Sequence, residues 1–213
     1  MKLRISDIAS ISIGYQHRGR MEPNTDGECR FIQIKDFDES HRLNPENIVR
    51  FTPDTDMRKY IVRPGDVLFL SRGHKNWATM LEYDPGYAVA TGYFFILRVK
   101  KDINIRILPE FLAWYLNQDP ARSVILSQAR GSHMPLVPMS AFREIEIEVP
   151  PVEVQGRIVE LSRLQRRERE LCAALLEKRQ LIVKHVCMNT LKKHIRNEKE
   201  NSNNGGTDIT DGD

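Results

Sequence analysis

Cysteine is scarce in this sequence, and long apolar runs are absent. The 213 residues include three cysteines, Cys29, Cys172 and Cys187. Their number is odd, no CxxC pair occurs, and Cys172 and Cys187 lie too far apart along a helix to form a disulfide within it. Free thiols in a cytoplasmic protein are therefore expected. No window reaches the roughly 20 apolar residues of a membrane span, and residues 1–13 lack the pattern of a signal peptide.

Motifs of common catalytic sites are also absent. The sequence contains no glycine-rich phosphate loop, no GxGxxG after a predicted strand and no HExxH. The tetrapeptides Asn-Pro-Pro-Tyr and Asp-Pro-Pro-Tyr, which mark amino-methyltransferases, do not occur either. Glu144, Glu146 and Glu148 alternate along one predicted strand, where solvated carboxylates are a simpler interpretation than a metal site. The sequence thus predicts a protein without catalytic residues, metal or cofactor of its own.

Two regions with different hydrophobic periods meet at residues 131–151. Residues 1–150 combine short apolar runs with turn signals, and they predict a compact α/β (α+β) domain with a mixed sheet. Residues 151–195 repeat apolar positions every three or four residues and predict one long helix. Residues 196–213, rich in Asn, Gly and Asp, are expected to form a disordered tail.

The apolar runs and turn residues predict the elements of the first region in order. Pro64 and Gly65 fit the two central positions of a type II turn, which leads into a fully apolar run. Proline near the start of each helix suits its first turn, and Ser6 or Asp7 can cap an earlier short turn of helix. Strands are predicted at residues 11–13, 29–34, 48–51, 67–70, 78–81, 87–91, 94–99 and 145–149, and helices at residues 108–117 and 120–128.

The long helix carries an apolar stripe that the preceding domain cannot cover. At 1.5 Å per residue, residues 152–194 would extend roughly 65 Å. Glu168 and either Lys178 or Arg179 interrupt the heptad, and charges within a seam can select one alignment of two helices. A surface helix with a few solvated charges is the alternative. The residues expected to pack against a second helix are Ile158, Leu161, Leu164, Leu171, Leu175 and Ile182.

Three polar loops, at residues 15–20, 72–77 and 130–134, carry side chains of the types that contact DNA. Arginine can pair with guanine, asparagine or glutamine with adenine, and lysine with phosphate. Polar side chains are common in any surface loop, and Trp77 fits a core anchor better than a DNA contact. The candidate DNA-binding residues are Gln16, Arg18, Arg20, Lys35, Arg72, His74, Lys75, Asn76, Arg130 and His133.

The order of several short motifs resembles one half of a type I restriction-modification specificity subunit. The two most specific motifs are Gly131-Ser132-x-Met134-Pro135 and Pro150-Pro151-x-Glu153-x-Gln155-x-x-Ile158. The other matching pieces are residues 3–14, Phe31-Ile32-Gln33-Ile34-Lys35-Asp36, Pro64-Gly65-Asp66-Val67-Leu68-Phe69 and Leu108-Pro109-Glu110-Phe111-Leu112. The resemblance covers roughly residues 1–190.

This resemblance implies a function and a set of partners. Such subunits hold two target-recognition domains and two helices that pair antiparallel and set the distance between two DNA half-sites. This sequence has one domain and one helix, which favours an antiparallel homodimer that reads a palindrome in double-stranded DNA with a nonspecific spacer. The implied protein partners are adenine methyltransferase modification subunits, which would bind S-adenosylmethionine, and a restriction or translocase subunit where the system has one.

A protein-interaction adaptor is the alternative from another class of function. Such a chain would bind modification subunits through the helix without reading a DNA sequence, as a decoy specificity subunit would.

The basic excess lies in the helical region, where residues 153–200 hold twelve Lys and Arg against seven Asp and Glu. That excess would give salt-dependent affinity for phosphates. A DNA shift assay with and without a modification subunit separates the two interpretations.

Overall fold

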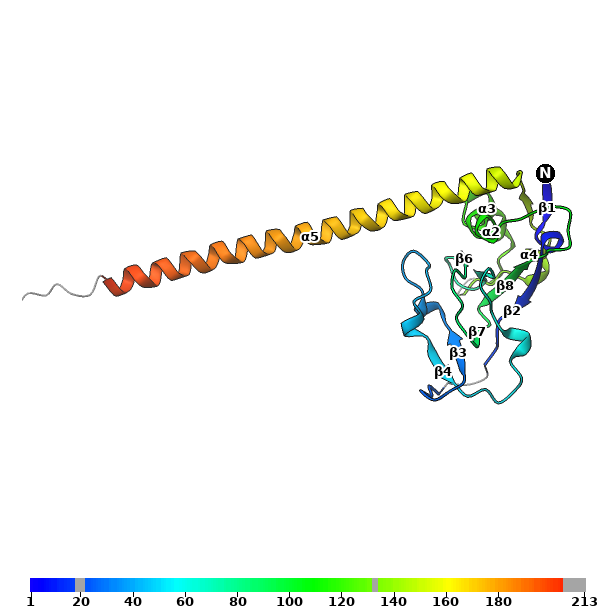
Figure 1. Ribbon diagram of the computed structural model, residues 1–213, viewed down its shortest axis with the longest axis horizontal. Helices are drawn as coiled ribbons and strands as arrows, with labels where there is room; N and C mark the ends of the chain where they lie inside the picture. Colours follow the sequence, from blue (N-terminus) through cyan, green and yellow to red (C-terminus); the bar gives the residue numbers. More distant parts are fainter. Residues whose placement is uncertain (18–21, 132–133, 205–213) are drawn as a thin grey trace, which may run out of the picture. The chain divides into compact units, whose positions relative to one another are not determined.

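The chain divides into two compact units, Met1–Arg163 and Leu164–Asp213. The computed structural model describes residues 1–17, 22–131 and 134–204. In this described part every strand belongs to the first unit, which we call the head (Figure 1). A mixed α/β head followed by a helical segment agrees with the fold class that the sequence predicts.

The strands of the head form three small sheets. They are β1 (Lys2–Arg4), β2 (Ala9–Ile13), β3 (Cys29–Ile32), β4 (Val49–Phe51), β5 (Val67–Leu70), β6 (Ala78–Met80), β7 (Ala88–Ala90), β8 (Phe94–Val99) and β9 (Glu146–Glu148). The largest sheet is antiparallel with the order β2-β8-β5-β6, the second has the order β4-β3-β7, and β1 pairs with β9. The pair β3–β7 is parallel. Every predicted strand is present, because each apolar run is bounded by turn residues.

The helices follow the predicted order with one addition. They are α1 (Ile5–Ile8), α2 (Pro109–Leu116), α3 (Asp119–Gln128), α4 (Met139–Arg143) and α5 (Val152–Asn204), with 3-10 turns η1 (Ile34–Asp36), η2 (Pro45–Asn47) and η3 (Arg58–Tyr60). The sequence did not predict α4, because five residues are too few to show a helical period. The predicted turn at Gly65 is confirmed by its φ of 84°, which a type II turn requires of its third residue.

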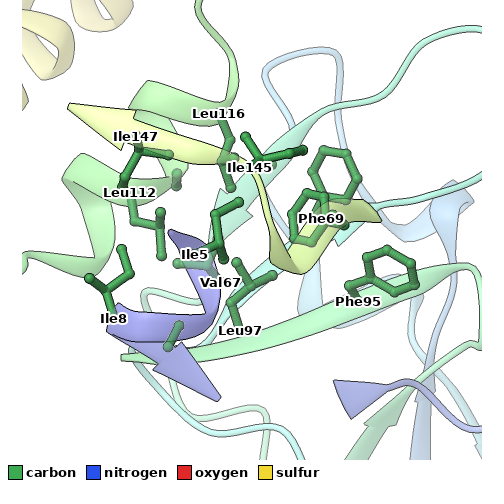
Figure 2. Packing of buried hydrophobic residues seen from close by; sticks show 14 of the residues in the cluster. Ile5, Ile8, Val67, Phe69, Phe95, Leu97, Leu112, Leu116, Ile145 and Ile147 are labelled. Carbon is green, nitrogen blue, oxygen red and sulfur yellow. The ribbon is translucent and has the colours of Figure 1, made fainter. Parts of the chain in front are cut away.

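The main core lies between the largest sheet and the helices of the head (Figure 2). Phe142 of α4 stacks on Phe69 of β5, with 4.5 Å between ring centroids, and its ring lies 5.3 Å from that of Phe95 in β8. Leu112 and Leu116 of α2 are fully buried in the same cluster. The short helix α4 therefore contributes one of the largest buried side chains in the head.

The first and last strands of the head close it into one unit. β1 and β9 pair in an antiparallel register from Lys2↔Glu148 to Arg4↔Glu146. The Ile5 amide donates to the Ile145 carbonyl at 3.0 Å. Glu146 and Glu148 are exposed on β9, and in the described residues no group of His, Cys, Asp and Glu is arranged to hold a metal ion.

A second core surrounds Trp77, which is 6% exposed. Its ring lies 5.0 Å from that of Phe37 and 5.5 Å from that of Phe94, both in edge-on or T-shaped geometry. His41 stacks on the same indole at 4.4 Å. The interpretation of Trp77 as a core anchor is confirmed.

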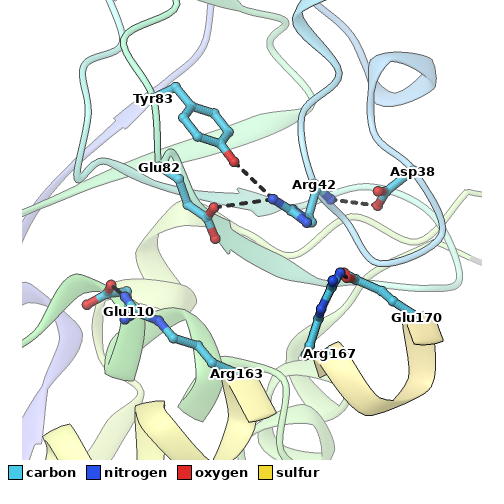
Figure 3. Close-up of polar contacts among 8 residues, drawn as sticks. All are labelled: Asp38, Arg42, Glu82, Tyr83, Glu110, Arg163, Arg167 and Glu170. Atoms are coloured by element: carbon cyan, nitrogen blue, oxygen red, sulfur yellow. Dashed lines mark hydrogen bonds and ion pairs between the residues drawn. The ribbon is translucent and has the colours of Figure 1, made fainter. Parts of the chain in front are cut away.

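The head continues past residue 150 into the first turns of α5, because one buried side chain joins them. Gln155 is completely buried. Its oxygen accepts from the Leu108 amide at 2.9 Å, and its amide nitrogen donates to the carbonyls of Arg106 and Pro150. Arg163 of α5 also pairs with Glu110 of α2 (Figure 3). The first unit, Met1–Arg163, therefore includes the first turns of α5.

α5 runs further than the helix predicted to end near residue 195. Residues 196–200 supply arginine, glutamate and lysine, which are good helix formers, and residues 196–204 contain no glycine or proline. The tail predicted to be disordered from residue 196 is thus helical to Asn204, and residues 205–213 lie outside the described residues. No helix in the described ranges is long and apolar enough to cross a membrane.

Candidate nucleic-acid interface

A cleft of about 580 Å³ in the head is lined by side chains from four separate segments of the chain. We call it the reading cleft. The predicted DNA-binding residues Gln16, Lys35 and Arg72 all line it. The other lining residues are Tyr15, His17, Phe31, Gln33, Ile34, Thr91, Gly92 and Tyr93. Folding therefore gathers a carboxamide, an ammonium and a guanidinium that are far apart in the sequence.

Glycines hold the first segment of the cleft against the connection between β7 and β8. A Cβ added at Gly14 would lie 2.3 Å from the Thr91 carbonyl oxygen, so only glycine allows this approach. The Tyr15 amide donates to the Ala90 carbonyl at 2.7 Å, and the Gly92 amide donates to the Tyr15 carbonyl at 2.8 Å. These bonds fix the backbone immediately before the exposed Gln16.

Arg72 is half-buried and oriented by an aromatic ring. Its guanidinium carbon lies 5.5 Å from the centroid of Tyr93, within the range of a cation–π contact. The Ser71 hydroxyl donates to the Tyr93 carbonyl at 2.8 Å, which holds the two segments together. Because Tyr93 is 41% exposed, the stacked pair lies at the surface of the cleft.

The third predicted loop lies directly beside the second. Arg130 and Leu136 exchange two backbone hydrogen bonds of 2.9 Å, and Leu136 also forms a β-bridge with Arg72. The Gly73 amide donates to the Pro135 carbonyl at 2.9 Å. Arg72 and Arg130 therefore both form backbone bridges with Leu136. The side chain of Arg130 is exposed. Arg18, Arg20 and His133 lie outside the described residues.

The segment with Lys35 is a rigid 3-10 turn, although the sequence predicted a strand as far as Ile34. Asp36 ends the strand early because its carboxylate accepts from the Gln33 amide at 2.8 Å. The Asp36 amide donates back to the Gln33 carbonyl at 3.1 Å. Asp36 is fully buried, and this burial raises the pKa of its carboxyl group. The turn leaves Lys35 exposed.

His74, Lys75 and Asn76 line a separate hollow of about 260 Å³ together with residues of α3. His74 and Lys75 are exposed. Asn76 is 6% exposed, and its amide donates to the Leu70 carbonyl at 2.8 Å. The main-chain carbonyl of Asn76 also accepts from the Arg122 guanidinium at 3.1 Å. In this structure the Asn76 side-chain amide holds the loop to β5, and its contact with DNA stays a prediction.

Sequence comparison identifies the family. A model described as the type I restriction modification DNA specificity domain matches residues 1–178. The chain belongs to this family. Comparison with curated proteins gives no match.

Three solved structures share the fold of this specificity domain. The S subunit of a type I restriction-modification system from M. genitalium is 13% identical, with a TM-score of 0.55 over 83% of this chain and 41% of that chain. A chain from a study of complex assembly and conformational transition of the type I R-M system is 22% identical, with a TM-score of 0.59 over 84% and 41%. The HsdS subunit from Thermoanaerobacter tengcongensis is 19% identical, with a TM-score of 0.54 over 78% and 37%. The chain thus spans about two fifths of each of these solved chains.

The specificity domain has cleft residues that the sequence did not single out. Gln33 and Tyr93 line the reading cleft beside the predicted residues. Gln33 lies within a motif that resembles the family, and Tyr93 follows Gly92 at the start of a predicted strand. Neither motif nor turn signal revealed that these two segments meet Gln16 and Arg72 in space.

The predicted dimerisation residues on α5 are mostly exposed within this chain. Ile158 is half-buried beside Val159, which is 7% exposed and packs in the head. The exposed members are Leu161, Leu164, Leu171, Leu175 and Ile182, each between 51% and 67% exposed. An ion pair of 3.3 Å joins Arg167 to Glu170 on this helix (Figure 3). These five apolar side chains of α5 are therefore exposed.

Proposed function

We propose that this protein is the non-catalytic DNA sequence-specificity subunit of a type I restriction-modification system. The observation that carries the proposal is the reading cleft, where Gln16, Lys35 and Arg72 converge from three segments. Glutamine and arginine are the side chains that recognise adenine and guanine edges in the major groove, and lysine contacts phosphate. Loops on a rigid scaffold present them.

We further propose that two copies pair through α5 and read the two halves of a palindrome. Positions 164, 168, 171, 175, 178 and 182 alternate steps of four and three, so they form one heptad seam. In an antiparallel pair centred near residue 173, Leu171 meets Leu175 of the second copy. The same register places Glu168 opposite Lys178. A parallel pair would instead place like charges opposite each other, so charge favours the antiparallel arrangement.

Adenine methyltransferase subunits are the proposed partners of this dimer, with a restriction or translocase subunit where the system has one. The methyltransferase would bind S-adenosylmethionine and flip the target adenine out of the duplex. The specificity subunit would determine which DNA sequence is recognised and the distance between its two half-sites. Its membership of the type I restriction modification DNA specificity domain family supports this division of roles.

The decisive experiment replaces Arg72 by alanine. The preferred duplex is first selected from a randomised library with the wild-type protein, with and without the methyltransferase subunit. Affinities for that duplex and for each single-base variant are then measured at one stated salt concentration. We expect Arg72→Ala to lose about 1–3 kcal/mol of discrimination at one position of each half-site. If the affinity fell equally for all duplexes, Arg72 would contact a phosphate and not a base.

Arg63→Ala is the matched control for this experiment. Arg63 is exposed and lines a groove with Arg98 and Lys100 at the opposite end of β8 from Tyr93. Its loss removes the same charge without touching the reading cleft. If the wild-type protein selects no preferred duplex in either condition, the reading function is wrong. The exposed stripe of α5 would then favour the adaptor that binds modification subunits without reading DNA.

A further inference from the structure

An exposed aliphatic side chain lines the reading cleft between two polar ones. Ile34 is 40% exposed, and it lies between Gln33 and Lys35, which line the same cleft. It does not belong to any of the three apolar core clusters found in the described part of the chain. Packing within the protein therefore does not account for its exposed surface.

The turn that carries Ile34 is fixed on both sides. The buried Asp36 closes η1 through its hydrogen bonds with Gln33. The Asn44 amide donates to the Asp36 carbonyl at 2.8 Å, and the Thr91 amide donates to the Ile32 carbonyl at 2.9 Å. The backbone on each side of Ile34 is thus bonded to distant segments. A rigid turn presents the apolar group at a defined place in the cleft, as sequence readout requires.

A carboxamide followed by an apolar group matches the major-groove edge of an A·T pair. Adenine offers an N7 acceptor and an N6 donor, which a glutamine can bind at once, and thymine offers its 5-methyl group to apolar side chains. Gln33 and Ile34 present these two chemistries from consecutive residues of one turn. Neither cytosine nor guanine carries a methyl group in this groove.

We propose that Ile34 contacts the 5-methyl group of a thymine in each half-site, with Gln33 beside it to read adenine. The inference rests on the proposed reading function and deepens it, because it names two specificity-determining residues and one base. Lys35, which follows Ile34 in η1, would contact the adjoining phosphate. The turn would then combine base reading and positioning within three residues.

The test removes single methyl groups from the DNA. Each thymine of the selected half-site is replaced in turn by uracil, which keeps the base-pairing edge and loses only the 5-methyl group. For the wild-type protein we expect one position at which affinity falls about fourfold, the factor equivalent to the roughly 0.8 kcal/mol of one buried methyl-sized group. Ile34→Ala should bind the thymine and uracil duplexes equally, while Ile34→Val should keep part of the difference.

Val124→Ala is the control, because Val124 is 45% exposed on α3 and does not line the reading cleft. It should leave the uracil effect unchanged. A selected half-site without thymine, or one in which no uracil weakens binding, would overturn the inference while leaving the reading function intact. A uracil effect that persists in Ile34→Ala would also overturn it, since another group must then contact the methyl. If the wild-type protein shows no sequence preference at all, the proposed function in DNA recognition is wrong instead.

Discussion

The seam on α5 gives the sharpest test of the proposed dimer, and its size follows from side-chain exposure. Leu171 is 54% exposed and Leu175 is 51% exposed. Complete burial of a leucine side chain contributes about 1.5–3 kcal/mol, so covering the exposed half contributes roughly 1 kcal/mol. Two positions in two copies give about 4 kcal/mol. Since about 1.4 kcal/mol corresponds to tenfold in affinity, losing these contacts should raise the dimer Kd about 1000-fold.

Leu171→Glu combined with Leu175→Glu should therefore yield monomers in sedimentation velocity over a range of concentrations in which the wild-type protein is dimeric. The introduced carboxylates would face each other at the centre of the antiparallel seam, and their repulsion adds to the loss. Leu176→Glu combined with Val183→Glu is the matched control. Both residues are about 60% exposed, but each lies about 100° around the helix from a seam residue. The control should stay dimeric.

The register of the seam has its own charge test. Glu168→Lys should weaken the dimer, because it would place two lysines opposite each other in each half of the seam. Adding Lys178→Glu should restore opposite charges and recover the affinity. A seam variant that remains dimeric, or a control that dissociates equally, would refute the assignment of this face. Failure of the second charge substitution to rescue the first would refute the antiparallel register.

Three further predictions concern the head. Burial raises the pKa of Cys29 to about 11, so its thiolate fraction at pH 8 falls about 100-fold. Alkylation of the folded protein, followed by peptide mass mapping, should therefore find Cys29 unmodified. The contribution of this neutral thiol to the free energy of unfolding should be lost only as the pH rises from about 9 through 11. Gly14→Ala should destabilise the head by about 1–3 kcal/mol in urea unfolding, because its Cβ would overlap the Thr91 carbonyl. Phe142→Ala should cost about 3–5 kcal/mol, because it removes a fully buried ring stacked on Phe69. An unchanged unfolding midpoint in either variant would refute the corresponding packing argument.

Much of the fold was accessible from the sequence because local signals agreed with tertiary packing. The run Val67–Leu70 is apolar at every position and forms β5, which is buried along its whole length. The Pro64-Gly65 pair gave the turn before it. In contrast, β1 and α4 are three and five residues long, too short for a period to appear. Both depend on partners that are distant in the sequence, since β1 pairs with β9 and Phe142 of α4 packs on Phe69 and Phe95. No local pattern reveals such contacts.

The reading cleft was only partly accessible from the sequence, because its shape depends on contacts between distant segments. Residue type was enough to nominate Gln16, Lys35 and Arg72, which share the cleft. It did not reveal that Asn76 is buried and that its side-chain amide donates to the Leu70 carbonyl. It overlooked Ile34, because an isoleucine within an apolar run is normally assigned to a core.

The head also separates the groups that determine stability from those that would determine sequence preference. The buried Asp36, together with the backbone bonds at Gly14 and Leu136, fixes the loops from beneath. The side chains of Gln16, Ile34 and Lys35, which these loops present, are exposed, and that of Arg72 is half-buried. A substitution such as Ile34→Ala removes little packing, so it can change which bases are favoured at small cost to folding. Changes at the supporting positions should instead disturb all cleft residues together, since Gly14 and Asp36 each hold a whole segment. This arrangement would let the recognised sequence diverge through exposed positions while the core and the α5 seam remain unchanged.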